Sequence, residues 1–249
     1  MKRLQKVLAV PSAFSETAAE EIIRAGRVKV DGRVVSEMGA KADPDTSRIE
    51  VDGHLIRAER KVYFLLYKPV GYVTTKRDPL GRRTVLDLLP GIKERIFPVG
   101  RLDYDTAGVL LLTNDGDLAH ALLHPRHGIE KTYRARVKGI PSAETLQALR
   151  RGIILSDGPT APAHLSLLAV DADSAWLEIT IREGRNRQIR RMGEAVGHPV
   201  FELIRTHLAF LTLKGLVPGR YRPLQPAEVT RLKAMAHWRR KPIPCKKRI

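Results

Sequence analysis

Apolar and polar residues alternate along Lys131–Lys138, so that Tyr133, Ala135 and Val137 share one face of the segment. This period of two predicts a half-buried β-strand. Residues 109–112 are all apolar and run into Asn114-Asp115-Gly116, which predicts a strand buried on both faces and ended by a turn. Further strands are expected at 62–68, where Pro69 stops the run, and at 163–170, 175–182 and 200–213. Helices are expected to begin at Asp117, Ser142 and Pro226.

Residues 1–58 read as a small separate module, joined to the rest by a linker at 59–61. Leu4, Val7 and Leu8 would share one face of a first helix, and Thr17-Ala-Ala-Glu20 is a capping-box pattern for a second helix ending at Gly26. Asp31-Gly32 between alternating residues predicts a hairpin. Such a unit is too small for much of an active site, so its expected role is binding. Its basic strands favour a nucleic acid as the partner, and a protein-docking module is the alternative.

The charge balance says more about the binding partner than about the fold. The 249 residues hold 44 Lys and Arg against 27 Asp and Glu, a net charge of +17. This excess points to nucleic acid, and less to an anionic membrane surface. No apolar run approaches membrane-spanning length and no signal-peptide core is present, and the single Cys245 leaves no internal disulfide. We expect a cytoplasmic protein, with no membrane association and a flexible basic tail at 236–249.

Two polar clusters stand out. The stretch 100–108 crowds Arg101, Asp103, Asp105 and Thr106 between two glycines just before the buried strand, where catalytic groups are best held. An ordinary Asp/Thr/Gly turn is the alternative. The segment 182–191 places many arginines at a strand–turn–helix junction, whose partners would be RNA phosphates or a buried carboxylate. A solvated basic helix is the alternative there.

Three further features are less specific. The loop 76–83 carries four basic residues and suits phosphate contacts, or is simply a solvated loop. His120, His124 and His127 have metal-like spacing only on one helix, which Pro125 breaks, so no metal site is expected. Tyr133 is either a core tyrosine or an aromatic platform for a base, and the sequence leaves these two open.

Residues 62–235 resemble the pseudouridine synthases that modify bacterial ribosomal RNA, and look closest to the branch that modifies the large-subunit (23S) RNA. Three stretches carry this resemblance: 66–71; 100–108 running into 113–116; and Lys131-Thr-Tyr133 with 183–192. Residues 1–58 are similar to the αL-type RNA-binding domain first known from a small-subunit ribosomal protein, through 3–8, 18–32 and 49–53. They depart from it at Glu16-Thr17, where such domains usually carry a basic pair.

The resemblance implies roles for individual residues. Asp103 would be the catalytic aspartate, Arg101 would displace the target uridine, Tyr133 would stack on the flipped base, and Arg190 would pair with Asp103. That pair also has a physical reason, because an aspartate buried in a base pocket needs a close cation to stay ionised. The catalytic residues would therefore be Asp103, Tyr133 and Arg190. RNA contacts are expected from Arg101, Arg3, Lys6, Arg27, Lys29, Lys68, Arg82, Arg83, Arg185 and Arg187.

We therefore expect an α+β fold: a mixed, mostly antiparallel central sheet with flanking helices and a catalytic cleft, beside the small N-terminal RNA-binding domain. The expected activity is isomerisation of one uridine in ribosomal RNA, with 23S RNA as the expected substrate. The enzyme is expected to act as a monomer, on free RNA or on a precursor particle. No metal, redox group or nucleotide is required. The alternatives are a non-catalytic RNA-binding or ribosome-assembly factor and an enzyme of small-molecule phosphates. Whether Asp103 attacks the sugar or the base, or removes a ribose proton, is left open.

Overall fold

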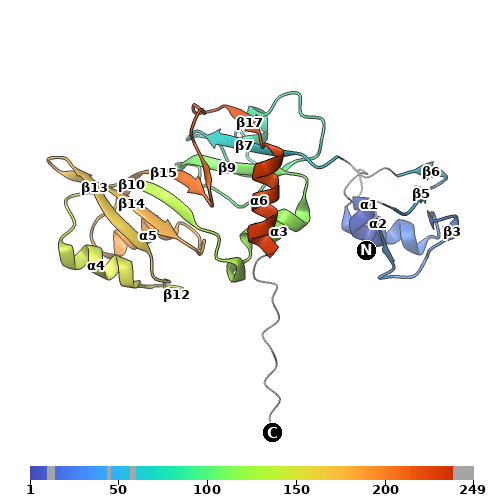
Figure 1. Cartoon of the computed structure of the whole chain (residues 1–249), viewed down its shortest axis with the longest axis horizontal. Helices are drawn as coiled ribbons and strands as arrows, with labels where there is room; N and C mark the ends of the chain where they lie inside the picture. Colours follow the sequence, from blue (N-terminus) through green and yellow to red (C-terminus); the bar gives the residue numbers. More distant parts are fainter. Residues whose placement is uncertain (10–14, 44–45, 57–59, 238–249) are drawn as a thin grey trace, which may run out of the picture. The chain divides into compact units, whose positions relative to one another are not determined.

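The computed structural model describes residues 1–9, 15–43, 46–56 and 60–237. It divides into two compact units (Figure 1): unit 1 is Met1–Lys61 with Lys93–Arg95, and unit 2 is Val62–Ile92 with the chain from Ile96 onward. The division falls at the end of the expected linker 59–61. Most of the expected tail at 236–249 lies outside the described residues.

Unit 1 is a small α/β module with one apolar core. Its sheet order is β3-β2-β5-β6, and β1 pairs separately with β4. Leu4, Leu8 and Ile23 of its two helices are almost fully buried against the strands. The elements are β1 (Lys2–Arg3), α1 (Leu4–Ala9), α2 (Glu16–Arg24), β2 (Val28–Val30), β3 (Arg33–Val34), β4 (Lys41–Ala42), β5 (Ile49–Val51) and β6 (His54–Leu55).

The hairpin and the second helix predicted for unit 1 are both present. Asp31 and Gly32 form the β2–β3 turn with φ of 51° and 82°, the left-handed conformation that an Asp-Gly pair adopts in tight hairpins. The capping residue of α2 was wrong: Ser15, not Thr17, accepts a hydrogen bond from the backbone N–H of Ala18. The helix therefore begins at Glu16, before the capping-box pattern.

Unit 2 is built on a nine-stranded mixed sheet, counted over the described chain, with the order β13-β14-β10-β15-β9-β7-β17 and with β16 and β8 attached to β15 and β9. Only the β9–β15 contact is parallel. The expected fold class is confirmed. In unit 2, β11 and β12 pair with each other in a separate two-stranded sheet. The strands of unit 2 are β7 (Tyr63–Lys68), β8 (Phe97–Pro98), β9 (Ala107–Thr113), β10 (Lys131–Lys138), β11 (Ile154–Leu155), β12 (Gly158–Pro159), β13 (His164–Val170), β14 (Ser174–Ile181), β15 (Val200–Leu208), β16 (Leu211–Thr212) and β17 (Tyr221–Pro223).

The helices of unit 2 cover two different cores. Residues of α4 and α5 pack in one core with β10 and β14, whereas α3 and α6 lie side by side in the other (Figure 1). Strand β9 contributes side chains to both cores, with Leu110 and Leu112 in the first core and Val109 and Leu111 in the second. This confirms a strand buried on both faces. The helices are η1 (Val85–Leu88), α3 (Gly116–Leu123), η2 (Pro125–His127), α4 (Ala143–Arg151), α5 (Gln188–Ala195) and α6 (Pro226–His237).

Ser142 caps α4 as predicted, by accepting from the backbone N–H of Thr145. The helix expected at Asp117 is instead capped by Asp115, which accepts from Leu118. The strand expected over 200–213 is two strands, β15 and β16, because Ala209 takes a left-handed φ of 53° and turns the chain back.

Candidate active site

The loop before β9 and the segment after β14 border one cleft of about 410 Å³ in unit 2. We call residues 100–106 the aspartate loop and residues 182–191 the arginine segment. Between them lie side chains of β10 and β15. The cleft is lined by residues 99–103, 106, 122, 123, 125, 131, 133, 181–189, 203, 205 and 208. The expected cleft across the sheet is therefore present, and Arg101, Asp103, Tyr133, Arg185 and Arg187 all line it.

Lys68, at the end of β7, holds the aspartate loop from beneath. Its side chain is fully buried, and its ammonium donates to the backbone oxygens of Asp103 (2.9 Å), Thr106 (2.8 Å) and Pro69 (3.1 Å). Burial lowers the pKa of Lys68 from 10.5 to about 8, while Asp105 and Asp103 oppose the shift. Lys68 was predicted as an RNA contact, and in this structure three backbone carbonyls occupy its ammonium.

Backbone and hydroxyl contacts fix the rest of the loop. Thr74 donates from its hydroxyl to the backbone oxygen of Leu102 at 2.7 Å, and the same hydroxyl accepts from the N–H of Leu102. The N–H of Gly71 donates to the oxygen of Tyr104 at 2.9 Å. The Asp103 carboxylate is left facing the cleft, with 29% of its side chain exposed.

The expected ion pair between Asp103 and Arg190 is not formed. Arg190 is buried, donates to the oxygen of Val200 at 2.7 Å, and pairs with the carboxylate of Asp105 at 3.1 Å. It also donates to the backbone oxygen of Asp105 at 2.9 Å. Because Val200 anchors one end of the guanidinium, the other end meets Asp105. The cation beside Asp103 is Arg187, at 3.8 Å, which also lies 3.4 Å from Asp105.

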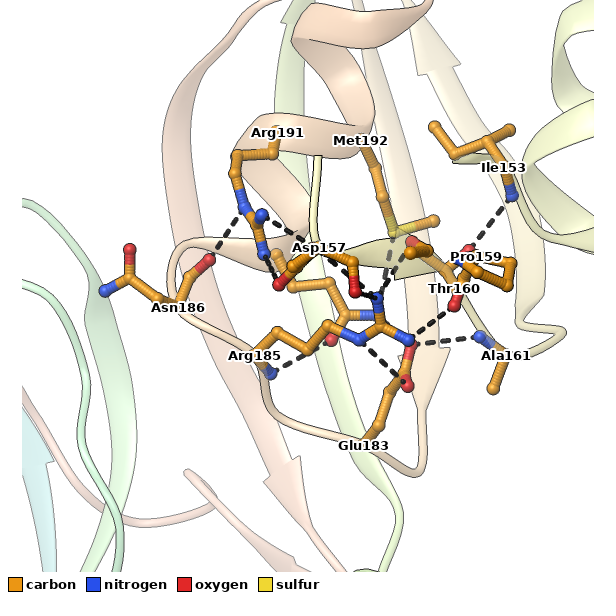
Figure 2. Close-up of polar contacts among 12 residues, drawn as sticks. Ile153, Asp157, Pro159, Thr160, Ala161, Glu183, Arg185, Asn186, Arg191 and Met192 are labelled. Atoms are coloured by element: carbon orange, nitrogen blue, oxygen red, sulfur yellow. Dashed lines mark hydrogen bonds and ion pairs between the residues drawn. The ribbon is translucent and has the colours of Figure 1, made fainter. Parts of the chain in front are cut away.

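Figure 2 shows how the arginine segment is tied to the β11–β12 turn. Asp157 in that turn forms two hydrogen bonds of 3.0 Å with Arg191. Arg185 donates to the backbone oxygens of Gly158 and Pro159 and lies 3.5 Å from the carboxylate of Glu183. Arg185 was predicted as an RNA contact; it lines the cleft, and its guanidinium is also engaged within the protein.

Tyr133 belongs to both of the settings that the sequence left open. Its side chain is 9% exposed and packs in the core with residues of β14 and α5, and it also lines the cleft. Directly across the β10–β15 pairing lies Arg205. Arg205 also lines the cleft and is 3% exposed.

Sequence reasoning missed two cleft cations, Lys131 and Arg205. Lys131 was noted only as part of a motif, and burial together with the charge of Arg205 lowers its pKa from 10.5 to about 8. The signal for Arg205 was available: it is a charged residue in the apolar stretch 200–213, between Leu203 and Leu208. A buried charge of this kind needs a partner.

The remaining predicted RNA contacts lie outside the cleft lining. Arg82 pairs with Asp78 at 2.8 Å, and Arg83 is exposed. In unit 1, Arg27 pairs with Asp52, while Arg3, Lys6 and Lys29 are exposed. These positions allow contacts with a nucleic acid, and the two pairs show that Arg82 and Arg27 have competing partners.

The rings of the three histidines contact one another in tilted and edge-to-face arrangements. Ring centroids of His120 and His124 lie 5.6 Å apart, and those of His124 and His127 lie 6.1 Å apart. Within the described ranges, no group of three His, Cys, Asp or Glu residues has the geometry to hold a metal ion. Every helix in those ranges is too short or too polar to cross a lipid bilayer.

Comparison with known proteins gives consistent matches along the chain. Residues 62–195 match the family described as RNA pseudouridylate synthase, and residues 2–45 match the S4 domain. The chain is 52% identical over 238 residues to ribosomal large subunit pseudouridine synthase B of Bacillus subtilis (strain 168), covering 95% of this chain and 97% of that protein.

A second relative is ribosomal large subunit pseudouridine synthase B of Salmonella typhimurium, 39% identical over 242 residues and covering 94% of this chain and 83% of that one. The solved structure described as "Crystal structure of pseudouridylate synthase" superposes with a TM-score of 0.65 at 31% identity. That match covers 93% of this chain and 100% of the other.

Proposed function

The chain belongs to the RNA pseudouridylate synthase family, and from that premise we propose that it converts one uridine of large-subunit ribosomal RNA to pseudouridine. The enzyme is an isomerase whose substrate is RNA. Support for the large-subunit RNA comes from the names of relatives that match nearly the whole chain. The observation that carries the site assignment is that Asp103 and Tyr133 line the same cleft, where the buried Lys68 ammonium holds the Asp103 backbone oxygen.

Asp103 is the residue that acts on the substrate. The reaction breaks the bond between ribose C1′ and uracil N1, turns the base, and joins C1′ to C5. A carboxylate suits this task because it is ionised at neutral pH without a helper base. Arg187, at 3.8 Å, supplies the positive charge beside it. A buried ammonium fixes the Asp103 backbone, so little reorganisation is needed when the substrate arrives.

The target base must leave its stack to reach this cleft, which costs a few kcal/mol. The Tyr133 ring provides a stacking surface, which contributes about 1–3 kcal/mol per base. Arg101 is exposed at the cleft, and it helps displace the target uridine from its RNA helix or fills the gap that the uridine leaves. Arg190 acts indirectly, as a positioning residue that holds the loop through Asp105.

Unit 1 binds RNA in this proposal, through the exposed side chains of Arg3, Lys6 and Lys29 together with Arg27. Arg82, Arg83 and Arg187 add phosphate contacts from unit 2. Such contacts are electrostatic, so affinity falls steeply as salt concentration rises. The enzyme acts as a monomer in the cytoplasm, on free 23S RNA or on a precursor particle.

The test is to map pseudouridine in ribosomal RNA from a strain lacking this gene, and to restore it with purified protein. Wild-type protein should add one pseudouridine to 23S RNA. Asp103→Asn should bind the same RNA and form no product. Asp173→Asn, an exposed carboxylate in the β13–β14 turn, is the matched control and should be fully active. Product from Asp103→Asn at the wild-type rate would instead favour a different catalytic residue.

A further inference from the structure

Arg205 is a buried cation with an unfilled donor. Its Nε donates to the backbone oxygen of Val109 at 2.8 Å. Its Nη2 is buried and has no hydrogen-bond partner among the described residues. Buried guanidinium donors are normally satisfied, because an unmade bond to a charged group costs more than one to a neutral group. Since Arg205 lines the cleft, a bound substrate is the natural source of the missing acceptor.

The strand register places this donor beside the candidate stacking residue. Arg205 on β15 lies directly opposite Tyr133 on β10, and opposite residues of an antiparallel pair point to the same face. Lys131 is two residues before Tyr133 on β10, so it shares that face. On the other side, Arg205 is aligned with Gly108, which follows the aspartate loop on β9. Arg205 therefore lies between the stacking tyrosine and the loop that carries Asp103.

Lys131 adds a second, weakly held cation. Its ammonium makes long hydrogen bonds to the backbone oxygens of Ile129 (3.4 Å) and Glu183 (3.3 Å). The Glu183 carboxylate is engaged by Gln188, Arg185 and the N–H of Ala161. Burial lowers the pKa of Lys131, and the positive charge of Arg205 lowers it further because the two cations repel each other. An acceptor that carries negative charge would relieve this repulsion.

We propose that Arg205 and Lys131 bind the carbonyl oxygens of the flipped uracil and stabilise the negative charge that develops on its ring during the reaction. This inference rests on the proposed function. When the C1′–N1 bond breaks, its electron pair stays with the base and spreads from N1 over O2 and O4. The base then bonds to C1′ through C5, loses the C5 proton, and takes up a proton at N1. Substrate and product are isomers, so no oxidant or co-reactant is needed.

The surroundings favour the base over a backbone phosphate as the occupant. Ile181, Leu203 and Leu208 line the cleft with these cations. Apolar walls around two positive charges suit a flat ring with polar edges. They also strengthen the attraction to charge that develops only in the transition state. A fully hydrated phosphate would lose more solvation here than at the exposed arginines.

The test compares single-turnover rates on saturating 23S RNA. Arg205→Gln should lower the rate about 100-fold, as removal of one charge-stabilising donor typically does, with RNA affinity within about twofold of wild type. The matched control is Arg134→Gln. Arg134 is on the same strand as Tyr133 but on the opposite, solvent-facing side, with 56% of its side chain exposed, and its removal should leave the rate unchanged.

An unchanged rate for Arg205→Gln would overturn the inference. A variant that loses only RNA affinity would also overturn it, if wild type loses the same affinity when a methylphosphonate replaces the phosphate 5′ to the target uridine. That result would identify a phosphate contact. If Arg205→Gln does not fold, Lys131→Gln provides the same test, because its side chain makes only long hydrogen bonds. Absence of pseudouridine with the wild-type protein would refute the proposed function instead.

Discussion

The buried guanidinium of Arg190 pairs with the carboxylate of Asp105 at 3.1 Å, while Asp103 keeps its carboxylate in the cleft. Only 5% of the Arg190 side chain is exposed. The two aspartates of one loop therefore have separate duties: Asp105 neutralises a buried cation, and Asp103 is available to a substrate.

Asp105→Ala should therefore destabilise unit 2, because it leaves the buried Arg190 without its counter-charge. The expected loss is about 1–3 kcal/mol, since the half-exposed carboxylate of Asp105 is partly screened by solvent. Asp103→Ala should change stability by less than about 0.5 kcal/mol, since Asp103 pairs with the half-exposed Arg187 at a distance of 3.8 Å. Urea unfolding at pH 7 measures both. Equal losses in the two variants would contradict this division of roles.

Gly108→Ala should cost about 2–4 kcal/mol. A Cβ there would clash with the backbone oxygen of Arg205 and lie 2.5 Å from its nitrogen, and Gly108 has a φ of 123°. The parallel contact of β9 with β15 therefore requires a glycine. Gly116→Ala is the matched control, because Gly116 opens α3 with nothing within 4 Å of its Cβ position. Thermal unfolding should show a clear loss for the first variant and no loss for the second.

Because the ammonium of Lys68 is buried, the free energy of unfolding should change with pH in the alkaline range. Burial holds its pKa at about 8 in the folded protein, against 10.5 when exposed. Between these values the unfolded chain binds more protons than the folded chain, so raising the pH stabilises the fold. Wild type should gain about 1.4 kcal/mol per pH unit relative to Lys68→Met across this window, and nothing below pH 8.

Urea unfolding of both proteins at pH 7, 8, 9 and 10 gives this slope. Lys214→Met removes an exposed lysine and should run parallel to wild type throughout. A constant difference between wild type and Lys68→Met from pH 7 to 10 would mean that Lys68 is not held in the way described.

Asp157→Asn should lower activity more than stability. The Asp157–Arg191 pair is partly exposed and screened by solvent, so its loss should have little effect on the free energy of unfolding. It nevertheless links the arginine segment to the β11–β12 turn, and that segment sets the position of Arg187 beside Asp103. We expect kcat/KM to fall about tenfold. Asp171→Asn, which breaks the comparable pair with Arg136, should leave kcat/KM unchanged.

Local patterns were sufficient for most of the fold. The apolar run at 109–112 gave β9, strict alternation gave β10, and Ser142 marked the start of α4. Each of these signals depends on residues adjacent in sequence. The errors at Thr17 and Asp117 were also local, since Ser15 and Asp115 were equally good caps two residues earlier.

The site was predictable only where one segment decides it. The motifs were sufficient to place Asp103 and Tyr133 at one cleft, but they did not predict which residues pair with the buried Lys68 and Arg190. Lys68 is buried because carbonyls 35 and 38 residues later converge on it. Arg190 meets Asp105 because Val200 fixes its other end. Both outcomes depend on where separate segments meet in three dimensions, which no local pattern encodes.

Strand β9 contributes alternate side chains to two cores, and its first residues continue directly from the aspartate loop. Neither core can open without exposing one side of that strand. The two halves of unit 2 are therefore coupled in folding, and the backbone amides of β9 should exchange with solvent only when the whole unit unfolds. Asp103 lies next to a strand that is buried on both faces, so substrate entry should depend on movement of the RNA rather than of the loop that carries the carboxylate.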